Sequence, residues 1–466
     1  MVGRQPEQRR RSVPAVHRFV STVPYRRYDA PHAVPATRDA GYDALVRADG
    51  MVHRSLFTDR GIFDREMVQI FGGNWVFLLH ETEIPNANDF KCVNVGRRPV
   101  IVTRTAEGEL RALLNRCTHR GTMVCAAPCG NAKRFQCAYH GWTFSNTGEL
   151  LTMTFPEGYG ATFDKAAHNL GRFSHVESYR GYVFGSLYAD VEPLIDWIGS
   201  ARPMLDESID ALQGKGARVV RSSTMVFEAN WKLQNDNNGD MYHVPFTHRS
   251  IAEMTRQRHG SGKALDHFRG DRNPMYVAYY GHGHKAIDQR PSIDSVWDRA
   301  RPVPGRESYA AALEAKVGRQ SAREYLELTG RAGINLVLYP NLIIAGGGSF
   351  NVYEPVAVDR TIVHSYGVVF DNLPGEVNAI KARFLEDFPG FGYRDDNEIF
   401  ERIQRALSTI PEMEWVDFSK GLGTDRESRT RDGTVIGNVS DETGIRGSYL
   451  WWKELMSRDV QPRALV

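Results

Sequence analysis

Residues 115–142 read NRCTHRGTMVCAAPCGNAKRFQCAYHGW, and the rest of the chain is organised around this stretch. It contains two Cys-His pairs, Cys117 with His119 and Cys137 with His140. One residue separates the members of the first pair, and two residues separate the members of the second. A glycine follows each pair closely, as a tight backbone turn over a metal centre requires. Two thiolates and two imidazoles therefore indicate a metal-binding loop pair.

Two kinds of metal centre use such ligands. Structural zinc sites usually take tight pairs of like residues, often C-x2-C with H-x3–5-H. In a Rieske [2Fe–2S] centre, two histidines replace two cysteines on one of the two irons. Here each short loop supplies one cysteine and one histidine, and the spacing differs between the loops. The pattern favours the dinuclear Rieske cluster over zinc.

Composition limits the class of protein and its partners. The chain has 466 residues, which is room for two or three domains with a sizeable core. The net charge of +2 favours neither nucleic acid nor an anionic membrane as partner. No apolar run approaches the roughly 20 residues of a membrane span. Five cysteines do not make a disulfide framework, so we expect a reducing, cytoplasmic location.

The order of predicted elements indicates β structure in the first half of the chain. Apolar spacing predicts a helix from Thr58 to Phe71, capped by Thr58 or Asp59. Short strands follow within a β-rich block at 75–188, namely Val93–Val95, Pro99–Thr103 and Tyr182–Phe184. Residues 249–328 look like a long polar loop. Later strands are predicted at 334–338, 342–344, 352–353 and 362–370, with helices near 395–407 and 449–456.

Residues 231–248 read WKLQNDNNGDMYHVPFTH and form a second dense motif. On a regular helix His243 and His248 would lie about 140° apart, so a broken or distorted helix is needed for both to reach one ion. Asp236 and Asp240 are spaced to share one helix face. Two histidines and a carboxylate form the facial triad of non-haem Fe(II) oxygenases, although His-x4-His alone is also frequent by chance.

The remaining histidines and cysteines have a structural interpretation. His282 and His284 are expected to be an exposed, solvated pair. Cys125 and Cys129 lie between the two ligand pairs, and we interpret them as buried or inert thiols. Cys92 belongs to a strand and is expected in the core.

Together, these motifs resemble the large (α) subunit of Rieske non-haem iron ring-hydroxylating oxygenases over residues 50–456, with benzoate-type enzymes nearest in motif. The C-x-H…C-x2-H pattern of that family is met by the two loops described above. Its second pattern is met by Trp231, Lys232, Asp236, Asn237, Asp240, Tyr242, His243 and His248. Asp236 departs from the benzoate-type relatives, which carry glutamate there.

The resemblance implies the third ligand of the mononuclear iron. It comes from the acidic cluster Asp395-Asp396-Asn397-Glu398 at the start of a late helix, and the second aspartate, Asp396, is assigned with Asp395 as the near alternative. The resemblance also implies that Asp240 bridges His140 of one subunit and His243 of its neighbour. Asp240 and Asn237 are the expected catalytic residues. Further pocket residues are expected to be Met241, Val244, Phe388, Phe391 and Tyr393.

The family implies a multicomponent enzyme. No G-x-G-x-x-G or other nucleotide fingerprint is present, so electrons must come from a separate reductase, with or without a ferredoxin. The implied reaction uses dioxygen to cis-dihydroxylate an aromatic substrate, and the motifs lean towards an aromatic carboxylate. Monohydroxylation or demethylation, and a non-catalytic Rieske electron carrier, are the alternatives. A homotrimer or an α3β3 assembly with a small β subunit is expected.

The implied fold is α+β. A β-rich Rieske [2Fe–2S] domain is expected at residues 73–190. A catalytic domain with the mononuclear iron is expected from residues 1–72 and 191–466, with an antiparallel sheet and helices packed on one face. Residues 1–40, rich in Arg and Pro, are interpreted as a solvated tail or an arm on a neighbouring subunit.

Overall fold

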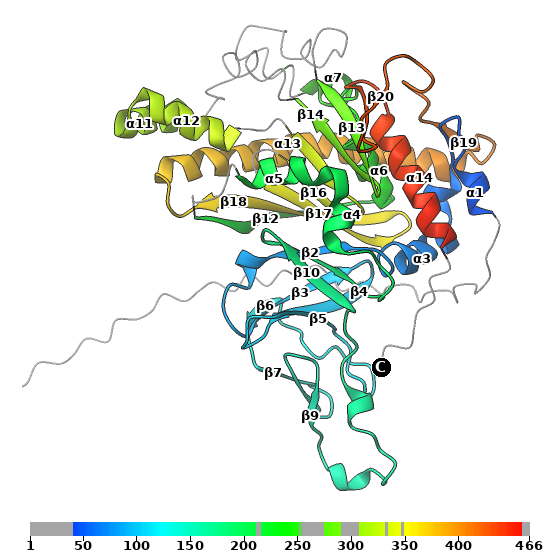
Figure 1. Ribbon diagram of the computed structural model, residues 1–466, viewed down its shortest axis with the longest axis vertical. Coiled ribbons are helices and arrows are strands. Elements are labelled where there is room, and N and C mark those ends of the chain that lie inside the picture. The colour runs from blue at the N-terminus through cyan, green and yellow to red at the C-terminus, as the bar shows by residue number, and fades with distance from the viewer. Residues whose placement is uncertain are drawn as a thin grey trace, which may run out of the picture. The chain divides into compact units, whose positions relative to one another are not determined.

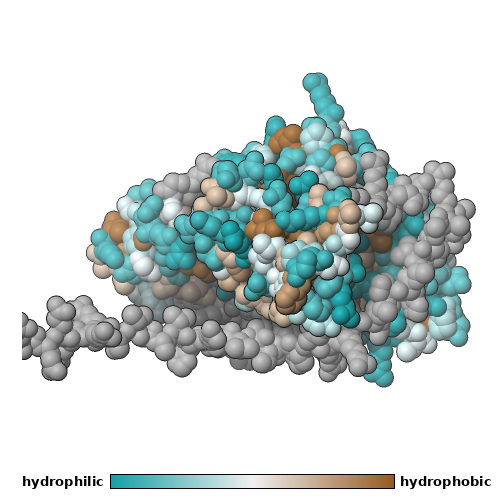
Figure 2. Space-filling view, turned by 90° about the horizontal axis from the view of Figure 1, so that it is seen from below, coloured by the Kyte–Doolittle hydropathy of each residue, from teal (hydrophilic) through white to brown (hydrophobic). Residues whose placement is uncertain are grey.

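The computed structural model shows a mixed α+β protein, as the sequence predicts (Figure 1). It describes residues 41–210, 216–250, 253, 275–289, 307–330, 334–345 and 349–458. The prediction for residues 1–40 lies outside the described residues. In the space-filling view of Figure 2, the described surface mixes hydrophilic residues with a few small hydrophobic patches.

The part of the chain that contains the two Cys-His loops has three small antiparallel sheets. The first has the order β5-β4-β3-β6, the second β7-β8-β9 and the third β10-β11-β2. Each short strand predicted in this block lies inside an observed strand, which confirms those predictions, and Cys92 lies in β3. The bounds are β2 Val76–His80, β3 Asp89–Val95, β4 Arg98–Arg104, β5 Leu110–Leu114, β6 Cys129–Asn131, β7 Arg134–Gln136, β8 Thr143–Ser145, β9 Leu150–Thr152, β10 His175–Tyr179 and β11 Tyr182–Ser186.

A nine-stranded antiparallel sheet forms the second half of the protein. Its order is β12-β18-β17-β16-β15-β14-β13-β21-β20. The four strands predicted between residues 334 and 370 are all present. The bounds are β12 Ala217–Phe227, β13 Tyr276–Gly281, β14 His284–Asp288, β15 Ile334–Leu338, β16 Leu342–Ala345, β17 Ser349–Ala357, β18 Arg360–Phe370, β20 Ser428–Arg429 and β21 Val435–Asn438. Leu336, Leu338 and Leu342 are fully buried, as the core of such a sheet requires.

The prediction of a long polar loop at 249–328 is wrong. Its described residues contain β13 and β14 and two helices, α11 Glu307–Val317 and α12 Arg319–Gly330. The interpretation of His282 and His284 as an exposed pair is also wrong. His284 is fully buried; its Nε2 lies 2.9 Å from the Trp197 carbonyl and its Nδ1 accepts the Tyr339 N–H at 3.1 Å. Burial and the neighbouring His282 lower the pKa of His284 to about 3.

The helices differ from the sequence prediction mainly at their ends. The predicted helix at 58–71 is divided at Asp59, whose side chain accepts the Ile62 N–H at 2.9 Å and so caps α3. The late helix begins at Gly375, so the acidic cluster at 395–398 lies well inside α13 and not at its start. The other bounds are α1 Tyr42–Leu45, α2 Ser55–Thr58, α3 Arg60–Gln69, α4 Leu194–Ile198, α5 Arg202–Asp210, α6 Trp231–Asn237, α7 Val244–Thr247, α13 Gly375–Thr409 and α14 Thr443–Ser457.

Hydrogen bonds from side chains attach the small sheets to the nine-stranded sheet. Asn341 accepts the Phe77 N–H and donates to the Phe77 carbonyl, both at 2.9 Å, where it is fully buried. Asn94 donates to Glu354 at 2.7 Å, and Glu354 also pairs with His364 at 2.8 Å. Figure 1 shows α13 crossing the nine-stranded sheet. A two-stranded sheet of β1 Met51–His53 and β19 Trp415–Asp417 lies beside these layers.

Candidate metal centres

The two Cys-His loops have the same backbone geometry. In each loop the cysteine N–H donates at 2.8 Å to the carbonyl five residues later, and the cysteine carbonyl accepts the N–H of the glycine four residues later. These glycines, Gly121 and Gly141, have φ of 82° and 70°. Because L side chains rarely adopt such a conformation, glycine is the residue that permits the turn. The predicted tight turns are present at both loops.

The ligand types pair across the two loops. Cys117 and Cys137 are buried and contact each other, and burial is the main cause that raises the pKa of the Cys117 thiol. The His119 and His140 rings lie 4.7 Å apart between centroids. His119 also stacks on Trp142 at 4.7 Å, and its buried Nδ1 has no hydrogen-bond partner among the described residues. A buried imidazole nitrogen without a partner is suited to a metal ion.

This arrangement fits two irons better than one zinc. In the described ranges, one group of three or more potential metal ligands has its ligand atoms all within 4.8 Å of one another. That group does not include the cysteines or histidines of the two loops. A tetrahedral zinc would bring all four of its ligand atoms together. Cysteine beside cysteine and histidine beside histidine instead suits a dinuclear cluster with different ligands on each iron.

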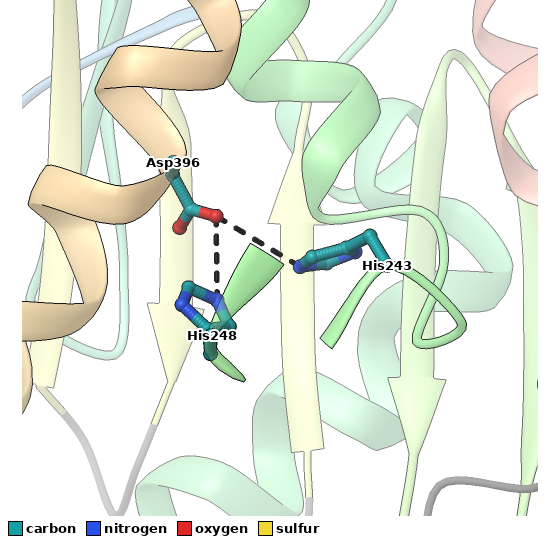
Figure 3. Close-up of side chains that lie close together, drawn as sticks. All are labelled: His243, His248 and Asp396. Atoms are coloured by element: carbon teal, nitrogen blue, oxygen red, sulfur yellow. Dashed lines mark ion pairs between the residues drawn. The ribbon is translucent and has the colours of Figure 1, made fainter. Parts of the chain in front are cut away.

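The group that does converge is His243, His248 and Asp396 (Figure 3). Asp396 Oδ1 lies 3.3 Å from His248 Nε2 and 4.0 Å from His243 Nε2. Burial is the main cause that raises the pKa of Asp396, and its Oδ1 accepts no hydrogen bond from the described residues. Asp395 faces the other side of His248, with Oδ2 at 3.5 Å from Nδ1, and it accepts the Ser250 hydroxyl. The structure therefore brings Asp396, and not Asp395, into the group.

The local backbone explains how both histidines reach one point. α6 ends at Asn237, and α7 is a single turn bounded by His243 and His248. The prediction of a broken helix is confirmed. The expectation that Asp236 and Asp240 share a helix face is wrong, because α6 stops before Asp240.

Asp240 and Asn237 contact members of the triad. Asp240 Oδ1 accepts both the Nδ1–H of His243 at 2.9 Å and the His243 backbone N–H at 3.1 Å. Burial lowers the pKa of His243, but the hydrogen bond to Asp240 and the charges of Asp240 and Asp396 outweigh it and raise the pKa. The Asn237 side chain donates to Asp396. Of the expected pocket residues, Tyr393 is half-buried, and its hydroxyl accepts a hydrogen bond from the Asn351 side-chain amide at 2.7 Å.

The other pocket residues and cysteines can be placed only in part. Met241 is buried and Val244 packs beside it. The side chains of Phe388 and Phe391 lie outside the described residues. None of the five cysteines forms a disulfide, and Cys125 is buried whereas Cys129 is exposed.

A buried polar network behind α6 was not expected from the sequence. Glu66 is fully buried and accepts three donors: Trp231 Nε1 at 2.9 Å, Lys232 Nζ at 2.6 Å and Trp452 Nε1 at 2.7 Å. The Trp-Lys pair of the motif is therefore part of the core. The sequence signalled Glu66 only by its place among the apolar residues of the helix predicted at 58–71, which is α3 in the structure.

Asp236 belongs to a neighbouring part of the same core. Its Oδ2 accepts the Tyr449 hydroxyl at 2.6 Å, and burial raises its pKa to about 7. Burial likewise lowers the pKa of Lys285 to about 8, with the charge of Asp236 opposing the shift. The aspartate that replaces the glutamate of benzoate-type relatives thus contacts α14 and does not enter the triad.

Comparison with known proteins places these features in one family. Residues 74–163 match the Rieske [2Fe-2S] domain, and residues 215–458 match the ring hydroxylating alpha subunit (catalytic domain). The 2-halobenzoate 1,2-dioxygenase large subunit of Burkholderia cepacia is 33% identical over 89% of this chain and 90% of its own length. Toluate 1,2-dioxygenase subunit alpha of Pseudomonas putida is 36% identical over 78% of this chain and 82% of its own.

A solved structure agrees. Naphthalene 1,2-dioxygenase with indole bound in the active site superposes with a TM-score of 0.73 at 26% identity, covering 90% of this chain and 95% of that one. The chain belongs to the family of ring-hydroxylating oxygenase large (α) subunits. It is an oxidoreductase with a Rieske [2Fe–2S] cluster and mononuclear iron. A relative from Ralstonia sp., 31% identical over 88% of this chain and 92% of its own length, is the large oxygenase component of a naphthalene 1,2-dioxygenase system. No helix in the described ranges is long and apolar enough to cross a membrane.

Proposed function

We propose that His243, His248 and Asp396 bind the mononuclear Fe(II). The observation that carries this proposal is the convergence of their ligand atoms within 4.8 Å, with a buried Asp396 oxygen that accepts no hydrogen bond from the described residues. Two histidines and a carboxylate leave coordination positions open, and Fe(II) held there supplies the activation of dioxygen. A protein that only carried electrons would have no use for this triad.

The residues around the triad prepare it for that metal. His243 donates its Nδ1–H to Asp240, which fixes the tautomer and leaves Nε2, the nitrogen that faces Asp396, unprotonated for coordination. Asn237 holds Asp396 by a hydrogen bond. Asp240 and Asn237 therefore orient the two ligands that they contact.

We further propose that Cys117, His119, Cys137 and His140 hold the cluster within a domain at residues 73–190, and that residues 1–72 and 191–466 form the catalytic domain. Electrons reach the cluster from a separate reductase, with or without a ferredoxin. Three copies of the chain, alone or with a small β subunit, form a ring in which Asp240 links His243 to His140 of the partner subunit. The support is the family and the "large oxygenase component" names of its relatives.

The proposed substrate is an aromatic carboxylate, which is cis-dihydroxylated with dioxygen. The support is that 2-halobenzoate and toluate dioxygenase subunits are 33% and 36% identical to this chain, whereas the naphthalene and dinitrotoluene dioxygenase components among its relatives are 30–32% identical.

A matched substrate panel tests this proposal. The purified oxygenase, with a reductase and NADH, is given benzoate, 2-chlorobenzoate, benzamide and naphthalene, and products are identified by mass spectrometry. We expect a gain of two oxygen atoms and two hydrogens on benzoate, turnover of 2-chlorobenzoate with or without release of chloride, and little turnover of benzamide, which has the same shape without the charge. Turnover of naphthalene alone would refute the carboxylate assignment, and a gain of one oxygen would refute dihydroxylation.

A further inference from the structure

The short turn that carries Asp240 is held at both ends by the beginning of α14. At one end, Gly239 packs so closely that a Cβ there would lie 2.4 Å from Ile445 Cγ1. At the other end, the Tyr242 hydroxyl donates to Glu442 Oε1 at 2.5 Å. Asp240 therefore lies between two contacts made with residues about 200 positions later in the chain.

Tyr242 is held on two sides by residues 418–446, which we call the C-terminal segment. Glu442 is 7% exposed and receives the hydroxyl, while the Lys420 Nζ lies 3.5 Å from the centroid of the Tyr242 ring. The backbone of Lys420 is itself bound to Glu442, because its N–H donates to Oε2 at 3.2 Å and its carbonyl accepts the Glu442 N–H at 3.1 Å.

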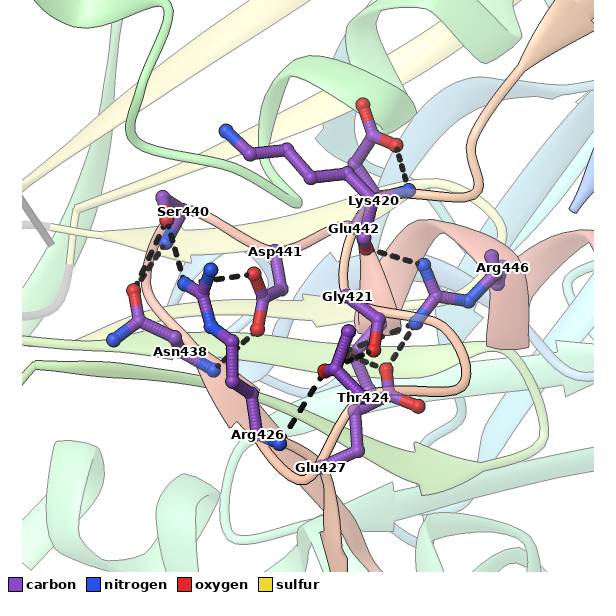
Figure 4. Close-up of polar contacts among 11 residues, drawn as sticks. Lys420, Gly421, Thr424, Arg426, Glu427, Asn438, Ser440, Asp441, Glu442 and Arg446 are labelled. Atoms are coloured by element: carbon purple, nitrogen blue, oxygen red, sulfur yellow. Dashed lines mark hydrogen bonds and ion pairs between the residues drawn. The ribbon is translucent and has the colours of Figure 1, made fainter.

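A polar network keeps this segment in place (Figure 4). Arg446 donates to the carbonyls of Phe418 and Lys420 at 2.9 and 2.6 Å and also pairs with Glu427. Asp441 is fully buried and pairs with Arg426 at 3.0 Å. The hydrogen bonds of the Arg446 guanidinium are charge-assisted, and such bonds are among the stronger hydrogen bonds in proteins. The Glu442 carboxylate that accepts the Tyr242 hydroxyl is therefore held in a fixed position.

The carboxylates of Glu442 and Asp240 lie close enough to affect each other. Burial is the main cause that raises the pKa of Glu442, and the Asp240 charge raises it further.

We propose that Glu442, acting through Tyr242, is a positioning residue for electron transfer to the mononuclear iron. It fixes the turn on which Asp240 lies and thereby the hydrogen bond from Asp240 to His243. This inference rests on the proposed role of Asp240 between the cluster and the iron. It assigns a task to the C-terminal segment, which contributes none of the proposed metal ligands.

Single-turnover kinetics on the assembled enzyme test the inference. The cluster is reduced with dithionite, mixed with dioxygen and benzoate, and its absorbance is followed by stopped flow; iron content and the electron paramagnetic resonance spectrum of the reduced cluster are measured on the same samples. The variants are Tyr242→Phe, Glu442→Leu, the double variant and Glu442→Gln. Tyr276→Phe is the matched control, because Tyr276 also donates to a buried carboxylate, Asp288, at 2.6 Å.

We expect cluster reoxidation to slow about tenfold in Tyr242→Phe and in Glu442→Leu, and no further in the double variant, because both remove the same link. Glu442→Gln can still accept the hydroxyl and should recover part of the rate. Iron content, the cluster spectrum and the Tyr276→Phe rate should not change. Normal reoxidation in Tyr242→Phe, or loss of its third iron, would overturn the inference. Failure of the wild-type protein to reoxidise with benzoate would instead contradict the proposed function.

Discussion

Replacing Asp240 by asparagine tests the proposed route between the two metal centres. Asparagine has nearly the same shape, and its amide oxygen can still accept one of the two N–H groups of His243 that Asp240 now accepts at 2.9 and 3.1 Å. The negative charge is lost. A hydrogen bond to a charged group contributes about 1.5–3 kcal/mol, against about 0.5–1.5 kcal/mol for a neutral one, so the expected loss is about 1–1.5 kcal/mol.

That loss corresponds to roughly tenfold weaker support of His243, at the lower end of the 10–100-fold effect typical for groups that orient metal ligands. We therefore expect the Asp240→Asn variant to keep its cluster spectrum and most of its mononuclear iron. Steady-state turnover should fall at least tenfold, with a slow reoxidation of the reduced cluster after substrate and dioxygen are added. A stopped-flow trace with normal reoxidation would refute the proposed electron route and leave Asp240 as a structural contact of His243.

Three further predictions test the cluster, the iron and the core separately. The Cys137→Ser variant should lose the visible absorption of the cluster, whereas Cys125→Ser combined with Cys129→Ser should keep it; the opposite result in absorption spectra would reassign the ligands. The Asp396→Ala variant should fall from about three irons per chain to about two in metal analysis, with the cluster spectrum unchanged. His284 has a folded-state pKa of about 3, below the unfolded value of about 6.5, so protonation favours unfolding as the pH falls below 6.5. The wild-type holoprotein should lose about 1 kcal/mol from this group between pH 6.5 and 5.5, and His284→Gln should show a smaller drop in thermal midpoint over that interval.

The cluster loops could be predicted closely because their determinants are local. Cys117 and Gly121 are four residues apart, so the sequence itself shows a glycine close to a proposed ligand. The structure shows that this glycine has the positive φ that the turn requires. The same applies to β15 and β16 of the nine-stranded sheet, whose residues are almost all apolar. Prediction failed where local composition and burial disagree. The segment around His282 and His284 is rich in glycine and polar residues, yet β14 lies in the centre of a sheet and buries His284 completely.

The triad shows a different limit. Spacing alone indicated that His243 and His248 need a broken helix, but it could not show where α6 ends, and the expected common face of Asp236 and Asp240 failed for that reason. Helix ends depend on tertiary contacts, here the close approach of Gly239 to Ile445. A contact between residues 206 positions apart leaves no periodic signal in the sequence.

The contacts of Glu66 show the same limit of prediction for the motif at residues 231–248. The Trp231-Lys232 pair stands beside the triad in the sequence, which suggests a role in the site, but both side chains donate to Glu66 in the core. The Lys232–Glu66 ion pair is buried on both sides, and breaking such a pair by removing one partner costs about 3–5 kcal/mol because an uncompensated charge remains. Three donors satisfy the Glu66 carboxylate, so the pair is tolerated only with α3, α6 and α14 all in place. Trp231 and Lys232, the first residues of the motif, thus hold α6 against the core. The end of α6 in turn sets where the turn that carries Asp240 begins. The position of the triad therefore depends on Glu66, a residue outside both sequence motifs.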